Sequence, residues 1–439
     1  NEDCSGYRQV LSDRIMGLIA AGPDAHRLDK PGGIFVRRSE QLSEEDRVLL
    51  QTVARAIVTD SAETLAEQVE RRPPIERRIP PFEPTRLPFE RRIAPPGRRP
   101  PFERRIAPFE RRLPSAGTAP TPPARELAFA NGLGGFTPDG REYVVTLAPG
   151  KTTPAPWANV LANERIGTVV SESGSAYTWA LNAHEFRLTT WHDDPVCDAS
   201  GEAWYVRDEE TGQFWSPTPL PARGLGTYVC RHGFGYSVFE YTQFGISSEL
   251  WTYVALDAPV KLAVVKLRNF SGRLRRLSVT GYWEWVLGQW RHANLMHVVT
   301  ETDPNTGALF ARNVYNREFA GCTAFVSATG PTRTVTGSRS EFLGRNGTPA
   351  DPAALHRAYL SGRTGAGLDP CAAVQVPLDV PDGQERDVVF VLGAGQNADE
   401  AHQLVRRFGG PASARQSLEQ VWEYWKRTLG VVHAETPDG

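Results

Sequence analysis

From Glu126 onward the chain is a succession of strand-length stretches with little helical pattern between them. Turn signals such as Asp139-Gly140 and Asp382-Gly383 separate most of these stretches. We expect strands at Glu142–Leu147, Gly167–Glu172, Ala176–Leu181, Ala203–Arg207, Tyr236–Thr242, Ser247–Ala255, Lys261–Asn269, Leu274–Val286, His297–Glu301, Gly307–Arg312, Thr323–Ser327 and Glu385–Leu392. So many strands with so few helices predict a mainly β fold, a large antiparallel sandwich.

Both ends of the chain carry helical patterns. At the C-terminal end, Asn397–Phe408 and Ser413–Leu429 are predicted helices. One face of the second carries a stripe formed by Leu418, Val421, Trp422, Trp425 and Leu429. A stripe of this kind needs a packing partner, which is either the sandwich or a domain that would follow Gly439.

The first 67 residues predict a short α/β piece. Helical spacing in the stretch SGYRQVLSDRIMGLIAAG precedes a short predicted strand, Gly32–Arg38, and Ser43 is placed to cap a second helix. This piece is small for a complete domain and the chain begins with Asn1, so we expect the tail of a preceding domain in a fragment of a longer protein. The predicted boundaries are 1–67 for this tail, 68–124 for a linker, 125–394 for the sandwich and 395–439 for linker helices.

A proline- and arginine-rich segment separates the two parts. Between residues 68 and 124 the phrase Phe-Glu-Arg-Arg-Ile-Ala-Pro recurs with small variations, as in Phe89–Ile93 and Phe102–Ile106. Proline removes backbone donors and favours extended neighbours, so the pattern predicts a disordered, semi-rigid linker. Its arginines outnumber its glutamates, which leaves two interpretations open: attraction to anionic lipid or an acidic partner, or a solvated spacer.

Charge and cysteine content exclude some classes of protein. The net charge of -2 argues against nucleic-acid or membrane-surface binding by the whole chain, and no apolar run reaches the ~18 residues of a membrane span. The 5 cysteines are far apart and form no CxxC pair, so the sequence predicts no zinc site and favours a reducing compartment.

The stretch Trp157–Pro195 combines aromatic and polar side chains in a pattern that suits a sugar. Sugar C–H faces stack on aromatic rings, while sugar hydroxyls need both donors and acceptors. The alternative is a sandwich core with a polar rim, because tryptophan more often serves packing. The predicted substrate-binding residues are Tyr177, Trp179, Asn182, Glu185, Arg187 and Trp191.

Catalytic chemistry is only weakly indicated. Glu185, Asp193 and Asp194 are carboxylates in the same stretch, but none can be placed opposite a partner across a scissile bond. His192 and Cys197 with these aspartates lack the spacing of a metal motif. We therefore assign no catalytic residue, metal or cofactor.

Several long motifs resemble a known family. The stretches NGLGGFTPDGREYVV, PWANVLANERIGTVVSESGSAYTWALNAHEFRLTTWHDDPV, RDEETGQFWSPTPLP and RHGFGYSVFEY are similar to the phosphorylase-like region of bacterial cyclic β-1,2-glucan synthases, which belongs to glycoside hydrolase family 94. The resemblance covers about Leu127 to Thr428. Residues 1–66 are similar to the segment that precedes this region, whereas the Pro/Arg linker matches no motif of the family.

The resemblance implies a β-supersandwich of the galactose-mutarotase-like type and a helical linker. In this family a catalytic (α/α)6 barrel follows and holds the general acid, so this chain alone is expected to be inactive. The implied partners are a β-glucan or glucose-containing oligosaccharide and the adjoining barrel. The resemblance also implies a location at the cytoplasmic side of the bacterial inner membrane. There the chain would be a soluble segment of a larger membrane protein. A non-catalytic carbohydrate-binding or structural module is the alternative.

Overall fold

The structure of the protein is a computed structural model that describes residues 15–19, 27–28, 33–36, 43–53, 125–192, 200–330 and 332–429. The chain separates into two compact units, Asn1–Ile93 and Ala94–Gly439, and each is described by itself. The predicted linker, residues 68–124, lies outside the described residues and stays a prediction.

In the first unit, helix α2 (Glu44–Val53) begins directly after Ser43. The Oγ of Ser43 accepts a hydrogen bond from the backbone N–H of Asp46 at 3.0 Å, which confirms the predicted cap. The predicted strand Gly32–Arg38 is wrong over its described part, because Ile34 forms only a single parallel bridge with Leu28. A strand needs a paired neighbour, and the described residues of this unit supply no longer pairing.

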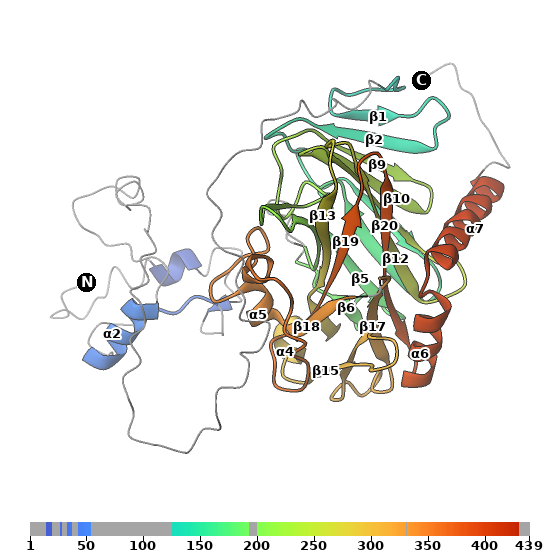
Figure 1. Cartoon of the computed structure of the whole chain (residues 1–439). Coiled ribbons are helices and arrows are strands. Elements are labelled where there is room, and N and C mark those ends of the chain that lie inside the picture. Colours follow the sequence, from blue (N-terminus) through green and yellow to red (C-terminus); the bar gives the residue numbers. More distant parts are fainter. Residues whose placement is uncertain are drawn as a thin grey trace, which may run out of the picture. The chain divides into compact units, whose positions relative to one another are not determined.

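The described strands of the second unit form three antiparallel sheets (Figure 1). The largest sheet has 10 strands in the order β1 (Gly134–Phe136), β2 (Glu142–Leu147), β9 (Tyr228–Gly233), β10 (Tyr236–Gln243), β11 (Ile246–Val254), β12 (Val260–Asn269), β20 (Glu385–Gly395), β17 (Thr323–Ala328), β16 (Leu309–Asn313) and β15 (Val298–Thr302). A second sheet has 5 strands in the order β18 (Thr334–Ser338), β19 (Pro370–Val380), β13 (Arg275–Trp283), β7 (Glu202–Asp208) and β8 (Phe214–Trp215). The third sheet also has 5, in the order β14 (Trp285–Gly288), β6 (Arg187–Thr189), β5 (Ala176–Ala180), β4 (Ile166–Ser171) and β3 (Ala158–Ala162).

A common core joins these sheets, because one cluster of buried apolar side chains draws on all three. The central strands of the ten-stranded sheet are apolar on both faces. On β12 and β20, Ala263, Val265 and Phe390 enter the common core, whereas Leu262 and Val391 belong to a separate cluster. Alternate residues of a strand point to opposite faces, so this second cluster lies on the outer face of the sheet.

Helices α6 (Ala398–Arg407) and α7 (Pro411–Leu429) cover that outer face (Figure 1). The side chain of Asn397 caps α6 by accepting from the backbone N–H of Glu400 at 2.9 Å. Leu404 and Val421 are buried against the sheet. The predicted Trp-rich stripe therefore packs on the sandwich, although Trp422 keeps 41% of its surface exposed.

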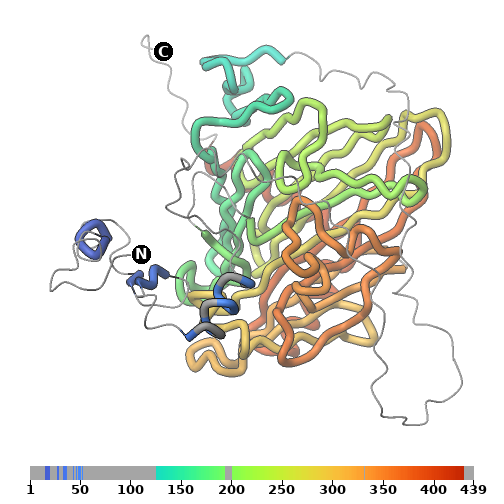
Figure 2. Tube along the Cα trace, turned by 90° about the vertical axis from the view of Figure 1, so that its left-hand side faces the viewer, coloured from blue at the N-terminus to red at the C-terminus, as the bar shows by residue number. Residues whose placement is uncertain are grey.

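On the opposite side, the segment between β18 and β19 covers the second sheet (Figure 2, orange). It contains α5 (Arg339–Leu343) and the 3-10 helix η4 (Ala353–His356). Phe342 and Leu355 pack there with Tyr205 and Tyr282 in a third buried cluster. A short helix, α4 (Arg291–Asn294), follows β14.

The predicted antiparallel sandwich is confirmed, and each strand predicted from Glu126 onward overlaps an observed one. One of them, Leu274–Val286, is instead two strands that belong to different sheets, β13 and β14. The chain changes sheet at Glu284, whose N–H donates to the carbonyl of Gly201 at 2.8 Å and whose carboxylate binds Arg291 and Arg339. The predicted set also lacks β1, β3, β6, β8, β9, β18 and β19.

Candidate functional site

The outer face of the third sheet carries the predicted aromatic residues. On β5, Ala176 and Ala180 point into the common core, so Tyr177 and Trp179 point to the other face. Gly167 on β4 leaves room for the indole of Trp179, because a Cβ atom there would lie 2.2 Å from the ring. The residues of β4 and β5 thus place two aromatic side chains on the outer face of this sheet and leave space for them to pack.

Three aromatic rings form a continuous group on this face. The ring centroids of Tyr177 and Trp179 are 5.3 Å apart, and those of Tyr177 and Trp191 are 4.5 Å apart with 39° between the ring planes. Tyr177 is buried, whereas Trp191 is 38% exposed. Trp191 is therefore the ring of this group that offers most surface to a ligand.

A polar group follows β5 directly in the chain. Asn182 shapes the turn, because its Oδ1 accepts from the backbone N–H groups of His184 and Glu185 at 2.9 Å each. The carboxylate of Glu185 accepts from Gln289 Nε2 at 2.7 and 2.8 Å and lies 2.8 Å from Nδ1 of His184. Hydrogen bonds from His184 and then Gln289 lower the pKa of Glu185 below its ordinary value.

Arg187 lies beside Trp179 but points its donors inward. Its Nε donates to the carbonyl of Ala183 and its Nη1 to the carbonyl of Gln289, both at 3.3 Å. Its guanidinium carbon lies 5.2 Å from the ring centroid of Trp290. Arg187 is only 8% exposed, so it holds the turn against the segment after β14 instead of offering donors to a ligand.

The six predicted residues form two groups: the rings of Tyr177, Trp179 and Trp191, and the polar turn with Asn182, Glu185 and Arg187. The cross-strand pair Trp179–Arg187 connects the two groups. Gln289 and Trp290 were not among them, although both contact predicted residues. They follow β14, which is distant from β6 in the sequence but pairs with it. This pairing places both residues next to the turn between β5 and β6. The local signal was a glutamine and a tryptophan a few residues after the predicted strand Leu274–Val286.

This face can bind a ring-shaped polar ligand better than it can break a bond. Trp191 offers a stacking surface, and Glu185 offers an ionised acceptor. A lowered pKa makes Glu185 a poor proton donor, which argues against its being a general acid. Asp193, Asp194 and Cys197 lie outside the described residues, and within those residues no group of three or more His, Cys, Asp and Glu side chains could hold a metal ion.

Residues 141–411 match the family model of the glycosyl hydrolase 94 supersandwich domain. The chain belongs to glycosyl hydrolase family 94. The family resemblance inferred from the motifs is therefore confirmed. The matched range contains the aromatic face, the three sheets apart from β1, and helix α6.

The named relatives of this family 94 chain are carbohydrate-active enzymes. It is 39% identical to the cyclic β-(1,2)-glucan synthase NdvB of Rhizobium meliloti (strain 1021) over 71% of this chain and 11% of that protein. It is 28% identical to an N,N'-diacetylchitobiose phosphorylase of Vibrio furnissii over 66% of this chain and 37% of that enzyme. The chain therefore spans well under half the length of either relative.

Among solved structures, the GalM/aldose epimerase homologue from C. elegans has a TM-score of 0.34 and 9% identity, over 55% of this chain and 100% of that one.

Within the described part of the family 94 chain, no helix has the length and apolar character needed to cross a membrane.

Proposed function

We propose that this chain is the carbohydrate-binding sandwich of an enzyme that processes β-1,2-glucan. Two findings support the proposal: the similarity to a cyclic β-(1,2)-glucan synthase and the aromatic face of the third sheet. The observation that carries it is Trp191, which is 38% exposed and packs against Tyr177, whose ring in turn packs against Trp179.

Each predicted residue then has a defined part in binding. Trp191 stacks on a glucose ring, with Tyr177 and Trp179 supporting it from behind. Glu185 accepts hydrogen bonds from sugar hydroxyls, while Gln289 fixes its orientation. Asn182 and Arg187 position the turn that carries Glu185.

The reaction belongs to an adjoining catalytic barrel of the same polypeptide in this proposal. That barrel would supply the general acid and the phosphate site for glycosyl transfer or phosphorolysis, and the parent protein would work at the cytoplasmic side of the inner membrane. The partial coverage of both relatives, 11% and 37%, supports a larger parent.

A titration with a linear β-1,2-gluco-oligosaccharide tests the binding role. Trp191→Ala should weaken binding about tenfold, because the stacking surface is lost. The matched control is Tyr315→Ala, which removes an aromatic side chain that is 70% exposed but lies in the segment after β16. Equal affinities of wild type and Trp191→Ala would refute this assignment.

A phosphorolysis assay separates the proposal from its alternative, a non-catalytic binding or structural module. This chain and a longer natural chain that includes the barrel should be given the same glucan and inorganic phosphate. We expect glucose 1-phosphate only from the longer chain, and a lower rate from its Trp191→Ala variant. An unchanged rate in that variant would favour the structural alternative.

A further inference from the structure

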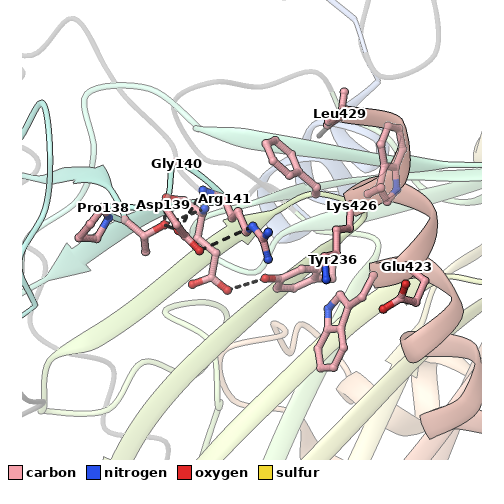
Figure 3. A pocket seen from close by; sticks show the side chains of 13 residues that line it. Pro138, Asp139, Gly140, Arg141, Tyr236, Glu423, Lys426 and Leu429 are labelled. Carbon is pink, nitrogen blue, oxygen red and sulfur yellow. Dashed lines mark hydrogen bonds and ion pairs between the residues drawn. The ribbon is translucent and has the colours of Figure 1, made fainter. Parts of the chain in front are cut away.

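A second concave site lies where α7 faces the turn between β1 and β2 (Figure 3). Its volume is about 1080 Å³. Figure 3 shows Asp139 and Arg141 on the turn, Glu423 and Lys426 on the helix, and Tyr236 between them. The pocket is therefore built from the ten-stranded sheet and the helix that covers it.

Close packing of α7 holds the two walls in place. Gly235, in the turn between β9 and β10, has a φ of +83°, and a Cβ atom there would lie 2.4 Å from Nε1 of Trp425. Val421, which is 1% exposed, anchors the same stretch of the helix on the sheet. The pocket wall is thus part of the packed fold.

Aromatic rings form the floor. Tyr236 stacks on Trp251 with ring centroids 5.6 Å apart, and Trp422 meets these two rings edge-on at 6.1 and 5.9 Å. Trp422 is supported by both rings and is still 41% exposed. A fixed, exposed indole of this kind offers a stacking surface at little cost in side-chain freedom.

Polar groups surround the aromatic floor with both donors and acceptors. Glu142 Oε1 accepts from Tyr236 Oη at 2.6 Å and from Arg231 Nη1 at 2.5 Å. The other oxygen, Oε2, accepts no hydrogen bond from the described residues. The carboxylate of Glu142 is therefore held in place by Oε1 and keeps Oε2 as an acceptor for a ligand.

The charges of the lining nearly balance. Three carboxylates (Asp139, Glu142 and Glu423) face two cationic side chains (Arg141 and Lys426), and Glu142 is also paired with Arg231. No excess of positive charge attracts a phosphorylated or acidic ligand, whereas a neutral polyhydroxyl ligand would find an aromatic surface, acceptors and donors together.

We propose that this pocket is a second binding site for a neutral glucan chain, separate from the Trp191 face. One glucose ring stacks on Trp422, and its hydroxyls reach Glu142 Oε2 on one side and Lys426 on the other. Only the identity of the glucan rests on the proposed function. A protein segment that covers Trp422 is the competing occupant.

Hydroxyl-radical footprinting of the full chain, with and without a linear β-1,2-gluco-oligosaccharide, tests this proposal at single residues. We expect the sugar to protect Trp422 and to leave Tyr424 unchanged, since Tyr424 is 42% exposed on the same helix but does not line the pocket. If the sugar protects Trp422 but not Trp191, the result supports the pocket at Trp422 and refutes sugar binding at the Trp191 face. Protection of Trp191 alone, or of neither residue, would overturn this proposal, as would a Trp422 that is shielded before sugar is added.

Two substitutions check the stacking role. Trp422→Ala should weaken binding at this site about tenfold, and Trp422→Phe should restore most of the affinity because it keeps an aromatic face. Tyr424→Ala is the matched control and should bind like the wild type. Equal affinity of Trp422→Ala and Tyr424→Ala, with both variants folded, would overturn the proposal.

Discussion

At the scale of single residues, His232 shows how burial fixes a protonation state. The Nδ1 atom of His232 lies 2.9 Å from Oγ of Ser237, and Nε2 lies 3.0 Å from the carbonyl of Trp157. A neutral ring satisfies both partners, with Nε2–H as the donor. Burial lowers the pKa of His232 to about 4.

This lowered pKa predicts a pH dependence of stability. The unfolded chain takes up the proton near pH 6.5, whereas the folded chain resists it down to about pH 4. The stabilisation is therefore complete above pH 6.5, and about 3 kcal/mol is lost as the pH falls to 4. Urea unfolding at a series of pH values measures it, and His232→Gln should flatten the curve in this window. An equally steep curve in the variant would contradict the assignment.

Arg187 is also a residue whose effect on stability can be predicted. Arg187→Ala removes the donor to the Ala183 and Gln289 carbonyls, so the free energy of unfolding should fall by about 1–3 kcal/mol. Thermal melts of the isolated chain measure this. A change within about 0.5 kcal/mol would instead indicate a residue that serves a cleft or an interface.

At the scale of elements, helix α7 depends on a glycine in another element. Gly235→Ala would place a methyl group against Trp425 and Val421 and would also strain a φ of +83°. We expect a loss of about 2–4 kcal/mol in the free energy of unfolding, from the strained backbone and the overpacking together. The control is Gly272→Ala, where φ is +77° and nothing lies within 4 Å, so only the backbone term remains. Equal losses in the two variants would show that the steric contact with α7 has no effect.

The elements that sequence reasoning missed have physical reasons in common. Strand β19 (Pro370–Val380) carries Pro377, which argues against a strand because proline cannot donate to a sheet. The partner β18 pairs only as far as Gln375, so Pro377 lies where that side of β19 is open. A single sequence gives no sign of where a neighbouring strand stops. By contrast, β12 and β20 were found because both faces are apolar.

The sequence predicted which residues the candidate site contains, but not the role of each residue. Local alternation placed Tyr177 and Trp179 together on one face. Arg187 and Glu185 each have one partner within the turn, but their shared partner Gln289 lies more than a hundred residues away in the chain and arrives through pairing of β14 with β6. Long-range pairing of this kind decides which polar groups are free for a ligand, and local pattern does not reveal it.

At the scale of the whole molecule, one buried ion pair connects all three sheets. Lys261 on β12 donates to Glu202 on β7 at 2.7 Å and to Thr168 on β4 at 2.9 Å. The side chains of Lys261 and Glu202 are 3% and 0% exposed. Burial lowers the pKa of Lys261, and the Glu202 carboxylate opposes that shift.

Breaking this pair should destabilise the whole sandwich. Glu202→Gln leaves a buried ammonium group without its counter-charge, so we expect a loss of about 3–5 kcal/mol in the free energy of unfolding. The control is Asp257→Asn, which removes the exposed partner of Arg407 and should change stability by less than about 1 kcal/mol. Denaturant unfolding measures both. A small effect of Glu202→Gln would show that water or a proton already compensates the lysine.

The position of β20 has a consequence for biosynthesis. This strand lies between β12 and β17 inside the ten-stranded sheet, yet it is the last of the described strands of that sheet to leave the ribosome. Until then, β12 and β17 both present unpaired edges, and the outer face that α6 and α7 cover is open to water. The nascent chain therefore carries an aggregation-prone surface from the emergence of β12 until β20 and the two helices follow. A chaperone that holds extended apolar segments would meet its main binding sites here between the emergence of β12 and that of α7.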